Sequence, residues 1–431
     1  ESSTPSYTGR YVFGTLVLMA IVGGGSHALG SSTTTNLANT YNHAPADRRD
    51  GSDYDPSHPK LTQRTLVTAV DDHASSETMG LLTALMEVRA EKRFLFGHQN
   101  DNYVGQYFKD ESGKLGYSDV KNSTGSYPAV FGFDWTDVIE NGLNFTEHVK
   151  FAFSQGAIIE FDWKPYNPEM GGDANQVKGT PCKKILKYTG KPYDKWIEWL
   201  DVIADSMETF KHNGASIPVI FRFLHENTGG WYWWGTGTYD STDTCEDDDY
   251  IALWNLTQSY LHETRDIHNL VWLYAPAKPA QWYASAFHER YPGDEHIDLV
   301  GFDRYDSINL YKDALLEDCR VVTNWSLYHN KIACVAETGI SDGMQNLSAA
   351  NASFYFDDFA TAIMNDTMHL CQKISYALTW ENVHPDLYWV PLPSDDTYPG
   401  FKDLYDSAWS VFSDDTKWQR DIKTYGYKRS P

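Results

Sequence analysis

Short runs of consecutive apolar residues recur eight times along the chain, and polar side chains follow nearly all of these runs. Runs without strict alternation are typical of strands that are covered on both faces, as in a parallel sheet. The runs cover residues 94–96, 129–133, 157–161, 217–223, 270–274, 297–302, 332–336 and 374–378. Residues 76–92, before the first run, have helical apolar spacing, and segments of helical length such as 195–212 and 250–267 lie between later runs. The pattern predicts eight strands that alternate with helices.

Eight strand–helix units predict an α/β fold, a (β/α)₈ TIM barrel with a single catalytic domain. Catalytic residues of this fold lie at the carboxyl ends of the strands, which is where the polar residues of this chain occur. The alternative is an open, doubly wound sheet, which would require a Gly-rich phosphate loop after an early strand. The sequence has no such loop, so the barrel is the prediction.

The amino-acid composition limits the kinds of molecule that the protein can bind. The chain has 431 residues, of which 41% are hydrophobic and 22% charged, as expected of a globular protein with a sizeable core. Its net charge of −24 would repel a phosphate backbone or an anionic membrane surface, so nucleic acid is excluded as a partner. The 15 Trp and 28 Tyr suit a neutral polymer that binds by stacking on aromatic rings.

The N-terminal sixty residues differ from the rest. Arg10 precedes an apolar run, 11–22, and 28–30 has the small-x-small form of a cleavage site, so 1–30 is predicted to be a signal peptide. A retained N-terminal anchor is the alternative. Residues 31–60 are predicted to be a disordered linker, and 61–431 the barrel domain. We expect a secreted, extracellular glycoprotein without membrane contact after cleavage, because seven Asn-x-Ser/Thr sequons occur. They lie at Asn122, Asn144, Asn255, Asn324, Asn346, Asn351 and Asn365.

The five cysteines are widely spaced, without a C-x-x-C pair, so a metal cluster is not expected. An oxidising compartment would allow two disulfides and leave one thiol free. Cys182 with Cys245 is the preferred pair, and the pairing among Cys319, Cys334 and Cys371 is left open.

Two of the apolar runs are followed by a glutamate. Glu226 follows the fourth run, and Glu337 follows the seventh run. In a barrel, strands three positions apart face each other across the mouth, so both carboxyl groups can flank one bond. Glycoside hydrolysis requires that arrangement, with one protonated acid and one ionised carboxylate. A single glutamate there would fit a structural ion pair equally well. The pair, next to the Trp-rich stretch 231–234, favours a glycosidase.

The stretch 222–235, Arg-x-x-His-Glu-Asn-Thr-Gly-x-Trp-Tyr-Trp-Trp-Gly, closely resembles the acid/base motif of glycoside hydrolase family 26. This family consists chiefly of endo-β-1,4-mannanases. Shorter matches to the family occur in the same order along the chain, at 97–99, 128–134, 301–305, 336–339 and 380–382. The resemblance therefore covers residue 61 to the C-terminus. The first motif is specific, because most related retaining barrels carry Asn-Glu where this family has His-Glu.

The resemblance implies that Glu226 is the general acid/base and Glu337 the nucleophile of a retaining reaction. Glu226 must hold its proton near neutral pH, and Glu337 must stay ionised. Arg222 and Tyr305 are expected near the oxygens of Glu337, and His225 is expected to fix the site beside Glu226.

The resemblance also implies a set of substrate-binding residues. Trp231 and Trp380 are expected to be platforms for sugar rings, whereas Trp233 and Trp234 are expected to pack inside the protein. The other predicted substrate contacts are His98, Asp134, Trp163, Lys164, Asn167, Asp303 and Asn382.

One residue departs from the family pattern. The family commonly has Trp-His-x-x-Asn-Pro after the third strand, whereas residues 163–168 read Trp-Lys-Pro-Tyr-Asn-Pro. Lys164 brings a point charge and no acceptor nitrogen, so it is expected to alter subsite preference or the pKa of nearby carboxylates.

The sequence therefore predicts endo-acting hydrolysis of β-1,4-mannosidic bonds in mannan, glucomannan or galactomannan by a monomer that uses no cofactor and no metal. The alternatives are a related β-glycanase, such as a mixed-linkage glucanase or β-1,3-xylanase, and an inactive carbohydrate-binding protein. The presence of both glutamates argues against an inactive carbohydrate-binding protein, because such a protein would not need two opposed acids.

Overall fold

The computed structural model describes residues 68–109, 115–236, 244–280 and 284–424. The predicted signal peptide, the linker and the first residues of the predicted domain lie outside these ranges. Eight parallel strands form a closed ring, and each pairs with the next around the barrel. In ring order they are β1 (Phe94–Gln99), β4 (Val130–Asp134), β5 (Ile158–Trp163), β8 (Val219–Phe223), β9 (Leu270–Tyr274), β10 (Leu299–Val300), β12 (Ile332–Ile340) and β13 (Ile374–Thr379).

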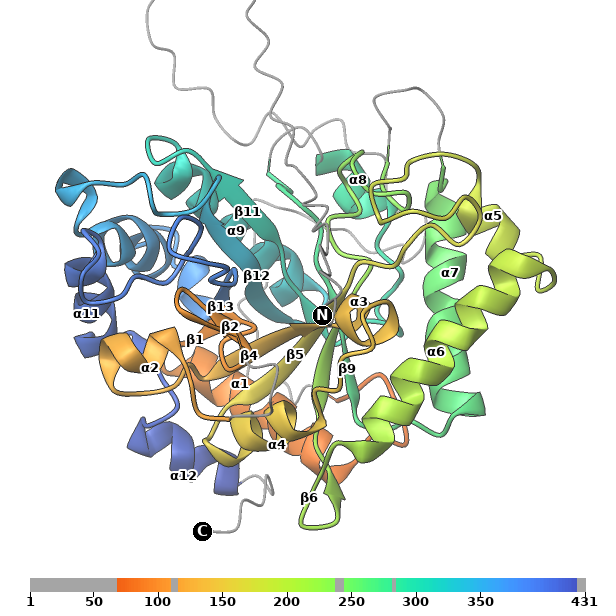
Figure 1. The fold of residues 1–431 in the computed structure, drawn as a ribbon, viewed down its shortest axis with the longest axis horizontal. Coiled ribbons are helices and arrows are strands. Elements are labelled where there is room, and N and C mark those ends of the chain that lie inside the picture. Colours follow the sequence, from red (N-terminus) through yellow and green to blue (C-terminus); the bar gives the residue numbers. More distant parts are fainter. Residues whose placement is uncertain (1–67, 110–114, 237–243, 281–283, 425–431) are drawn as a thin grey trace, which may run out of the picture. The chain divides into compact units, whose positions relative to one another are not determined.

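The ring closes where β13 pairs with β1 in parallel, with Leu95 opposite Tyr376. The sixth strand is interrupted after β10, and its continuation β11 (Asp303–Asp306) pairs with β12. All eight predicted strands are present, and the predicted (β/α)₈ barrel is confirmed. Figure 1 shows the strands enclosed by helices, with α6 and α7 on one side and α9 and α11 on the other.

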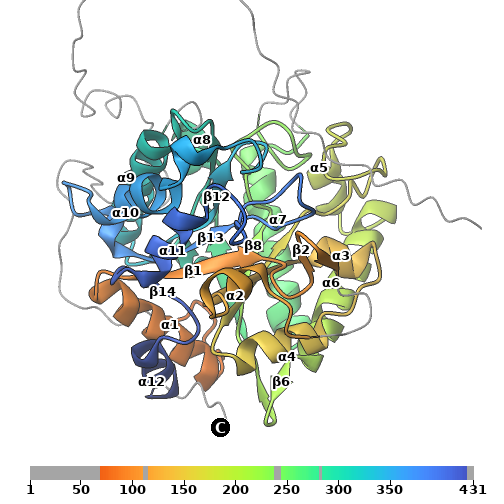
Figure 2. The same ribbon diagram turned by 60° about the vertical axis from the view of Figure 1, so that its left-hand side comes forward.

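The helices follow the strands as the sequence pattern predicts. They are α1 (Ser76–Ala90), α2 (Asp119–Thr124), α3 (Trp135–Ile139), α4 (Thr146–Ser154), α5 (Pro181–Ile185), α6 (Lys191–Thr209), α7 (Asp247–Ser259), η2 (Tyr260–Thr264), α8 (Ala284–Glu289), α9 (Tyr311–Tyr328), η3 (Ala349–Asn351), η4 (Tyr355–Ala360), α10 (Thr361–Met364), η5 (Cys371–Lys373), α11 (Tyr398–Asp406) and α12 (Thr416–Thr424). Short strands complete the fold: β2 (Val104–Gly105), β3 (Phe108–Lys109), β6 (Lys211–His212), β7 (Ala215–Ser216) and β14 (Ser410–Val411). Figure 2 shows α1 and α12 near each other at one end of the barrel.

Alternation along β5 explains how apolar and charged residues share one buried strand. Phe161 stacks on Trp135, and Trp163 stacks on Trp196 of α6, so this face of the strand packs against the helices. Glu160 and Asp162 occupy the alternate positions and therefore point into the barrel. The interior consequently contains charged groups that require partners within the ring.

Two disulfides link outer elements of the barrel. Cys182 and Cys245 are bonded, with Cα atoms 5.2 Å apart, which confirms the preferred pair. Cys319 and Cys371 form the second bond, and Cys334 is a free, buried thiol on β12. Within the described ranges, none of the helices combines the length and the hydropathy needed to cross a membrane.

Candidate active site

Glu226 follows β8 in a backbone conformation that few residues adopt. Its φ is 53°, in the left-handed region, and Leu224 two residues earlier has a φ of 42°. Side chains other than glycine are strained there, and such strain persists where the surroundings fix the backbone. The N–H of Glu226 donates to the carbonyl oxygen of Ala275, just beyond β9, at 2.8 Å. The turn therefore ties the strand end to its neighbour and places a partly exposed carboxyl group at the mouth of the barrel.

Burial and a second carboxylate raise the pKa of Glu226 to about 7. Desolvation is the larger cause and the charge of Glu337 the next. The indole Nε1 of Trp231 donates to Oε2 of Glu226 at 2.7 Å, which opposes this rise. A carboxyl group with this pKa carries its proton in a large fraction of molecules at neutral pH.

Glu337 lies on β12 and accepts two short hydrogen bonds. Nη2 of Arg222 donates to Oε2 at 2.6 Å, and the phenol of Tyr305 donates to Oε1 at 2.7 Å. These are the contacts expected of Arg222 and Tyr305. Donors on both oxygens favour the charged form of a carboxylate.

Arg222 is completely buried and connects several carboxylates inside the barrel. Besides Glu337, Nη1 donates to Oδ2 of Asp303 at 2.8 Å, and Nε lies 3.0 Å from Oε1 of Glu160. Nη2 is also 3.9 Å from Oδ1 of Asp162. One guanidinium therefore compensates charges from strands β5, β11 and β12.

His225 lies next to Glu226 and is 2% exposed. Burial, followed by the charges of Arg222 and Lys164, holds its pKa well below the usual range, so the imidazole is neutral. Its Nδ1 has no hydrogen-bond partner among the described residues, and its backbone carbonyl accepts from the indole of Trp234 at 2.8 Å. The position beside Glu226 is as expected, and the proposed fixing role stays a prediction.

One group of side chains in the described ranges has metal-ligand spacing. Ligand atoms of His225, Asp303 and Glu337 lie within 4.8 Å of one another. Arg222 already donates to both carboxylates, so a metal cation would meet an existing positive charge. We assign these residues no metal, and the expectation of metal-free chemistry stays a prediction.

The two predicted sugar platforms are partly exposed, as a stacking surface requires. Trp231 is anchored through its indole N–H to Glu226, and the Lys164 ammonium lies 4.3 Å from the ring centroid of Trp380. That ammonium is also 3.1 Å from Oδ2 of Asp134 and 3.7 Å from Oδ2 of Asp162. These carboxylates keep the pKa of Lys164 well above its usual value despite burial, so the residue is a cation at the cleft.

Trp233 and Trp234 are completely buried, and their rings pack edge to face at 5.3 Å, as the sequence reading expected of them. Five residues of the predicted site are likewise buried and contact protein groups, and their contact with sugar stays a prediction. Trp163 is 0% exposed and stacks on α6. Asn167 donates to the carbonyl oxygens of Gln176 and Lys178 and so shapes its own loop.

Asn382 donates to Asp119 and accepts from the N–H groups of Trp389 and Val390. Asp303 is 1% exposed, and its Oδ2 is bound by Arg222. A fifth predicted contact, His98, is 0% exposed, and its Nδ1 lies 2.8 Å from Asp101. Asn, Asp and His at strand ends fit either role in a sequence, because buried polar groups also require partners.

The structure also places at the site residues that were not predicted from the sequence. Glu160 and Asp162 face Arg222, and Asn100 donates to Oε2 of Glu381 at 2.6 Å beside Trp380. The available signal for the first two was a pair of acids, two positions apart, at the end of an otherwise apolar run.

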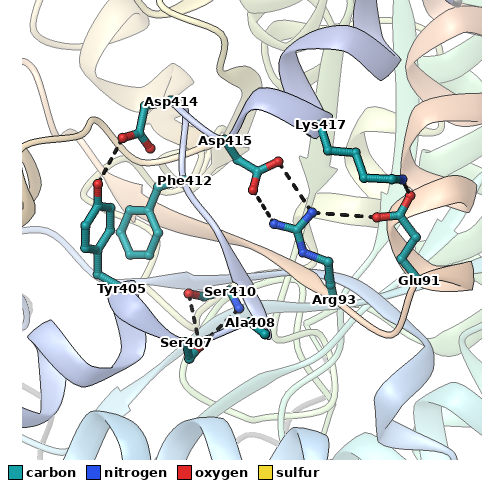
Figure 3. Close-up of a pocket in the computed structure, with 10 residues that line it drawn as sticks. All are labelled: Glu91, Arg93, Tyr405, Ser407, Ala408, Ser410, Phe412, Asp414, Asp415 and Lys417. Atoms are coloured by element: carbon teal, nitrogen blue, oxygen red, sulfur yellow. Dashed lines mark hydrogen bonds and ion pairs between the residues drawn. The ribbon is translucent and has the colours of Figure 1, made fainter.

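A separate pocket of about 690 Å³ lies beside the beginning of β1 (Figure 3). The beginning of β1 is at the opposite end of the strands from Glu226 and Glu337. Its charges are paired with each other, since Arg93 contacts Glu91 and Asp415, and Lys417 contacts Glu91. Tyr405 donates to Asp414 at 2.9 Å. This network ties the start of β1 to the segment that leads into α12, and we place the functional site at the other end.

A closed parallel barrel with two acids at the carboxyl ends of its strands and indoles beside them is the arrangement of the barrel glycoside hydrolases. The comparison with known proteins gives the particular family. The family model for glycosyl hydrolase family 26 matches residues 70–385, and the chain belongs to that family.

Curated relatives carry the name mannan endo-1,4-beta-mannosidase. The protein from Bifidobacterium adolescentis is 28% identical over 340 residues, which are 73% of this chain and 32% of the relative. The protein from Bacillus subtilis is 27% identical over 251 residues, 56% of this chain and 66% of the relative. The chain thus spans about a third of the length of the first relative and just under two thirds of the second.

Solved structures agree in fold. A GH26 beta-mannanase from Bacteroides ovatus superposes with a TM-score of 0.69 and 28% identity, over 79% of this chain and 96% of that one. A double mutant of a Cellulomonas fimi endo-beta-1,4-mannanase superposes with a TM-score of 0.74 and 26% sequence identity. The match covers 82% of this chain and 80% of that one.

Proposed function

We propose that this protein is an endo-β-1,4-mannanase that hydrolyses mannan-type polysaccharides with retention of anomeric configuration. The observation that carries the proposal is the difference between two carboxyl groups at one barrel mouth. Glu226 has a pKa near 7, whereas Glu337 accepts from a guanidinium and a phenol. The names of the relatives support β-1,4-mannosidic bonds as the substrate.

In the proposed first step, a carboxylate oxygen of Glu337 attacks the anomeric carbon while Glu226 gives its proton to the leaving glycosidic oxygen. The sugar–oxygen bond breaks and a glycosyl–Glu337 ester forms. As the ester forms, the charge of Glu337 disappears, and the hydrogen bonds from Arg222 and Tyr305 weaken.

In the second step, Glu226 is an anion and removes a proton from water. The water oxygen attacks the anomeric carbon, the ester bond breaks, and Glu337 recovers its negative charge. The indole of Trp231, which donates to Oε2 of Glu226, stabilises Glu226 in this anionic state. Two inversions give a product with the original anomeric configuration.

The decisive experiment compares initial rates on mannan, glucomannan, galactomannan, lichenan and β-1,3-xylan, with sizing of the products. The proposal expects the mannan-type substrates to be cleaved fastest, with internal cuts that release oligosaccharides of mixed length. Equal or greater rates on lichenan or β-1,3-xylan would instead select the related β-glycanase. Proton NMR of the first-formed products tests retention, which an initially inverted anomer would contradict.

The pKa of Glu226 predicts the alkaline side of the pH profile. The first step requires protonated Glu226, so kcat/KM should be maintained below pH 7 and fall about tenfold per pH unit above it. Trp231→Phe removes a hydrogen bond that lowers this pKa, so the alkaline limb should move to higher pH. Profiles from pH 4 to 9 with a soluble oligosaccharide measure both effects, and an alkaline limb unmoved in Trp231→Phe would contradict the assignment of the limb to Glu226.

We also propose that the protein is a secreted glycoprotein and a monomer. Two disulfides support an oxidising compartment. Four of the sequon asparagines are exposed on the surface: Asn122, Asn144, Asn346 and Asn365. Asn324 is buried in α9 and is left out of the proposal. Intact mass before and after deglycosylation, together with light scattering, tests both statements.

A further inference from the structure

A buried glutamate inside the barrel, Glu160, has no part in the proposed reaction. It is 1% exposed, and both of its oxygens face groups on other strands. Oε1 lies 3.0 Å from Nε of Arg222, and Oε2 accepts a hydrogen bond from the phenol of Tyr376 at 2.6 Å. Tyr376 is on β13 and Arg222 on β8, so Glu160 links two strands across the interior of the barrel.

The contact with Arg222 connects Glu160 to the reacting groups. All three guanidinium nitrogens of Arg222 face carboxylates: Nε faces Glu160, Nη1 donates to Asp303, and Nη2 donates to Glu337. The hydrogen bonds at Nη1 and Nη2 fix the guanidinium, whereas Nε and Oε1 of Glu160 form a close ion pair without hydrogen-bond geometry. The effective charge of Arg222 therefore depends on Glu160.

We propose that Glu160 is a positioning residue: it forms an ion pair with Nε of Arg222, and its charge sets how strongly Arg222 acts on Glu337 and Glu226. This inference rests on the proposed function, in which Glu337 must be ionised and Glu226 protonated. Glu160 acts only through Arg222 and does not touch the reacting atoms.

The ionisable groups that act on Glu160 come from four other strands. They are Arg222 on β8, Asp303 on β11, Cys334 and Glu337 on β12, and Tyr376 on β13. Burial raises the pKa of Glu160 to about 7, against the lowering effects of Arg222 and the hydrogen bond from Tyr376. Glu160 is therefore neutral in acid and ionised on the alkaline side of neutrality.

The sign of the effect on activity follows from these charges. The positive charge of Arg222 lowers the pKa of Glu226. Ionised Glu160 offsets part of that charge, which lets Glu226 keep its proton to a higher pH. In acid, Glu160 is already neutral, so its charge has no influence on the acid limb of the pH profile.

Glu160→Gln tests this asymmetry, because glutamine keeps the shape and an acceptor oxygen but never ionises. The alkaline limb of kcat/KM on a manno-oligosaccharide should move to lower pH by roughly 0.5–1 unit, the effect of one nearby charge at an effective dielectric near 20. The acid limb should stay in place, and kcat at pH 5.5 should stay within about threefold of the wild type. Equal loss of activity at every pH would mean a merely structural role and would overturn the proposal.

Two further variants sharpen the test. Tyr376→Phe removes a hydrogen bond that lowers the pKa of Glu160, so it should move the alkaline limb in the same direction by a smaller amount. Asp298→Asn is the matched control, because Asp298 is a buried carboxyl group with a pKa raised to about 6 that accepts from the N–H groups of Trp272 and Val70. A limb shift in Asp298→Asn as large as in Glu160→Gln would refute a specific link through Arg222.

Carboxyl ¹³C NMR of the ligand-free protein separates this inference from the proposed function. With Glu226 assigned through Glu226→Gln, its titration midpoint should fall in Glu160→Gln, and one glutamate signal that titrates near pH 7 should disappear. An unchanged Glu226 midpoint overturns the inference even if mannan is cleaved. A wild type that cleaves none of the polysaccharides fails the proposed function, and the NMR midpoints still decide the role of Glu160.

Discussion

Replacing Glu337 by alanine should abolish hydrolysis of mannan-type polysaccharides, with a loss of kcat of about 10⁴-fold or more. No other described carboxylate accepts hydrogen bonds from both Arg222 and Tyr305, so a glycosyl ester has no alternative site. The fold should persist, because Arg222 keeps its contacts with Glu160 and Asp303 and the guanidinium remains paired. Initial rates and thermal unfolding of the same preparations measure the two effects.

The control for this variant is Glu289→Ala, which removes an exposed glutamate at the end of α8 and should leave both rate and stability unchanged. Calorimetric titration with a manno-oligosaccharide should show that Glu337→Ala still binds, because the partly exposed Trp231 and Trp380 are retained. Full activity in Glu337→Ala would remove the basis of the proposed mechanism.

Replacing Glu226 by alanine should reduce the rate on polysaccharide by about 10²–10⁴-fold, the usual contribution of a general acid/base. An aryl glycoside with a good leaving group needs little protonation, so its first step should survive and the glycosyl ester should accumulate. Azide needs no general base, so it should attack that ester and restore turnover. The glycosyl azide formed should have the same anomeric configuration as the substrate.

The configuration of the azide product separates the two glutamates. In Glu337→Ala, azide can only replace the missing nucleophile in a single displacement, so any azide product should be inverted. NMR of the azide products from both variants measures this difference. If the retained and inverted products occurred in the opposite variants, Glu337 would be the acid/base and Glu226 the nucleophile.

Much of the fold was predictable from the sequence because its signals are local. A short run of consecutive apolar residues predicts a buried strand without any knowledge of which strands lie next to it. Eight such runs, separated by helices, are compatible with few architectures. The positions of Glu226 and Glu337 at the ends of the fourth and seventh runs followed from the same pattern. The prediction of packing for Trp233 and Trp234, and the preferred disulfide of Cys182 with Cys245, also agree with the structure.

The polar residues at the other strand ends were not predictable in the same way. Trp163, Asn167 and Asn382 have the same residue types as a sugar-binding wall, yet their partners are protein groups. Whether a polar side chain at a strand end faces the cleft or a neighbouring loop depends on how the loops pack. That packing joins residues far apart in the chain, such as Asn382 and Asp119, and no local periodicity encodes it.

The sequence by itself thus determined the barrel, the end at which the site lies, and the two acids of the proposed reaction, because strand direction and side-chain alternation are local properties of the chain. Only the tertiary structure decided what surrounds those acids. The pKa of Glu226 depends on desolvation and on Glu337, and the charge available to Glu337 depends on Arg222 and Glu160. These effects depend on distances between side chains of different strands, which are set only when the barrel closes.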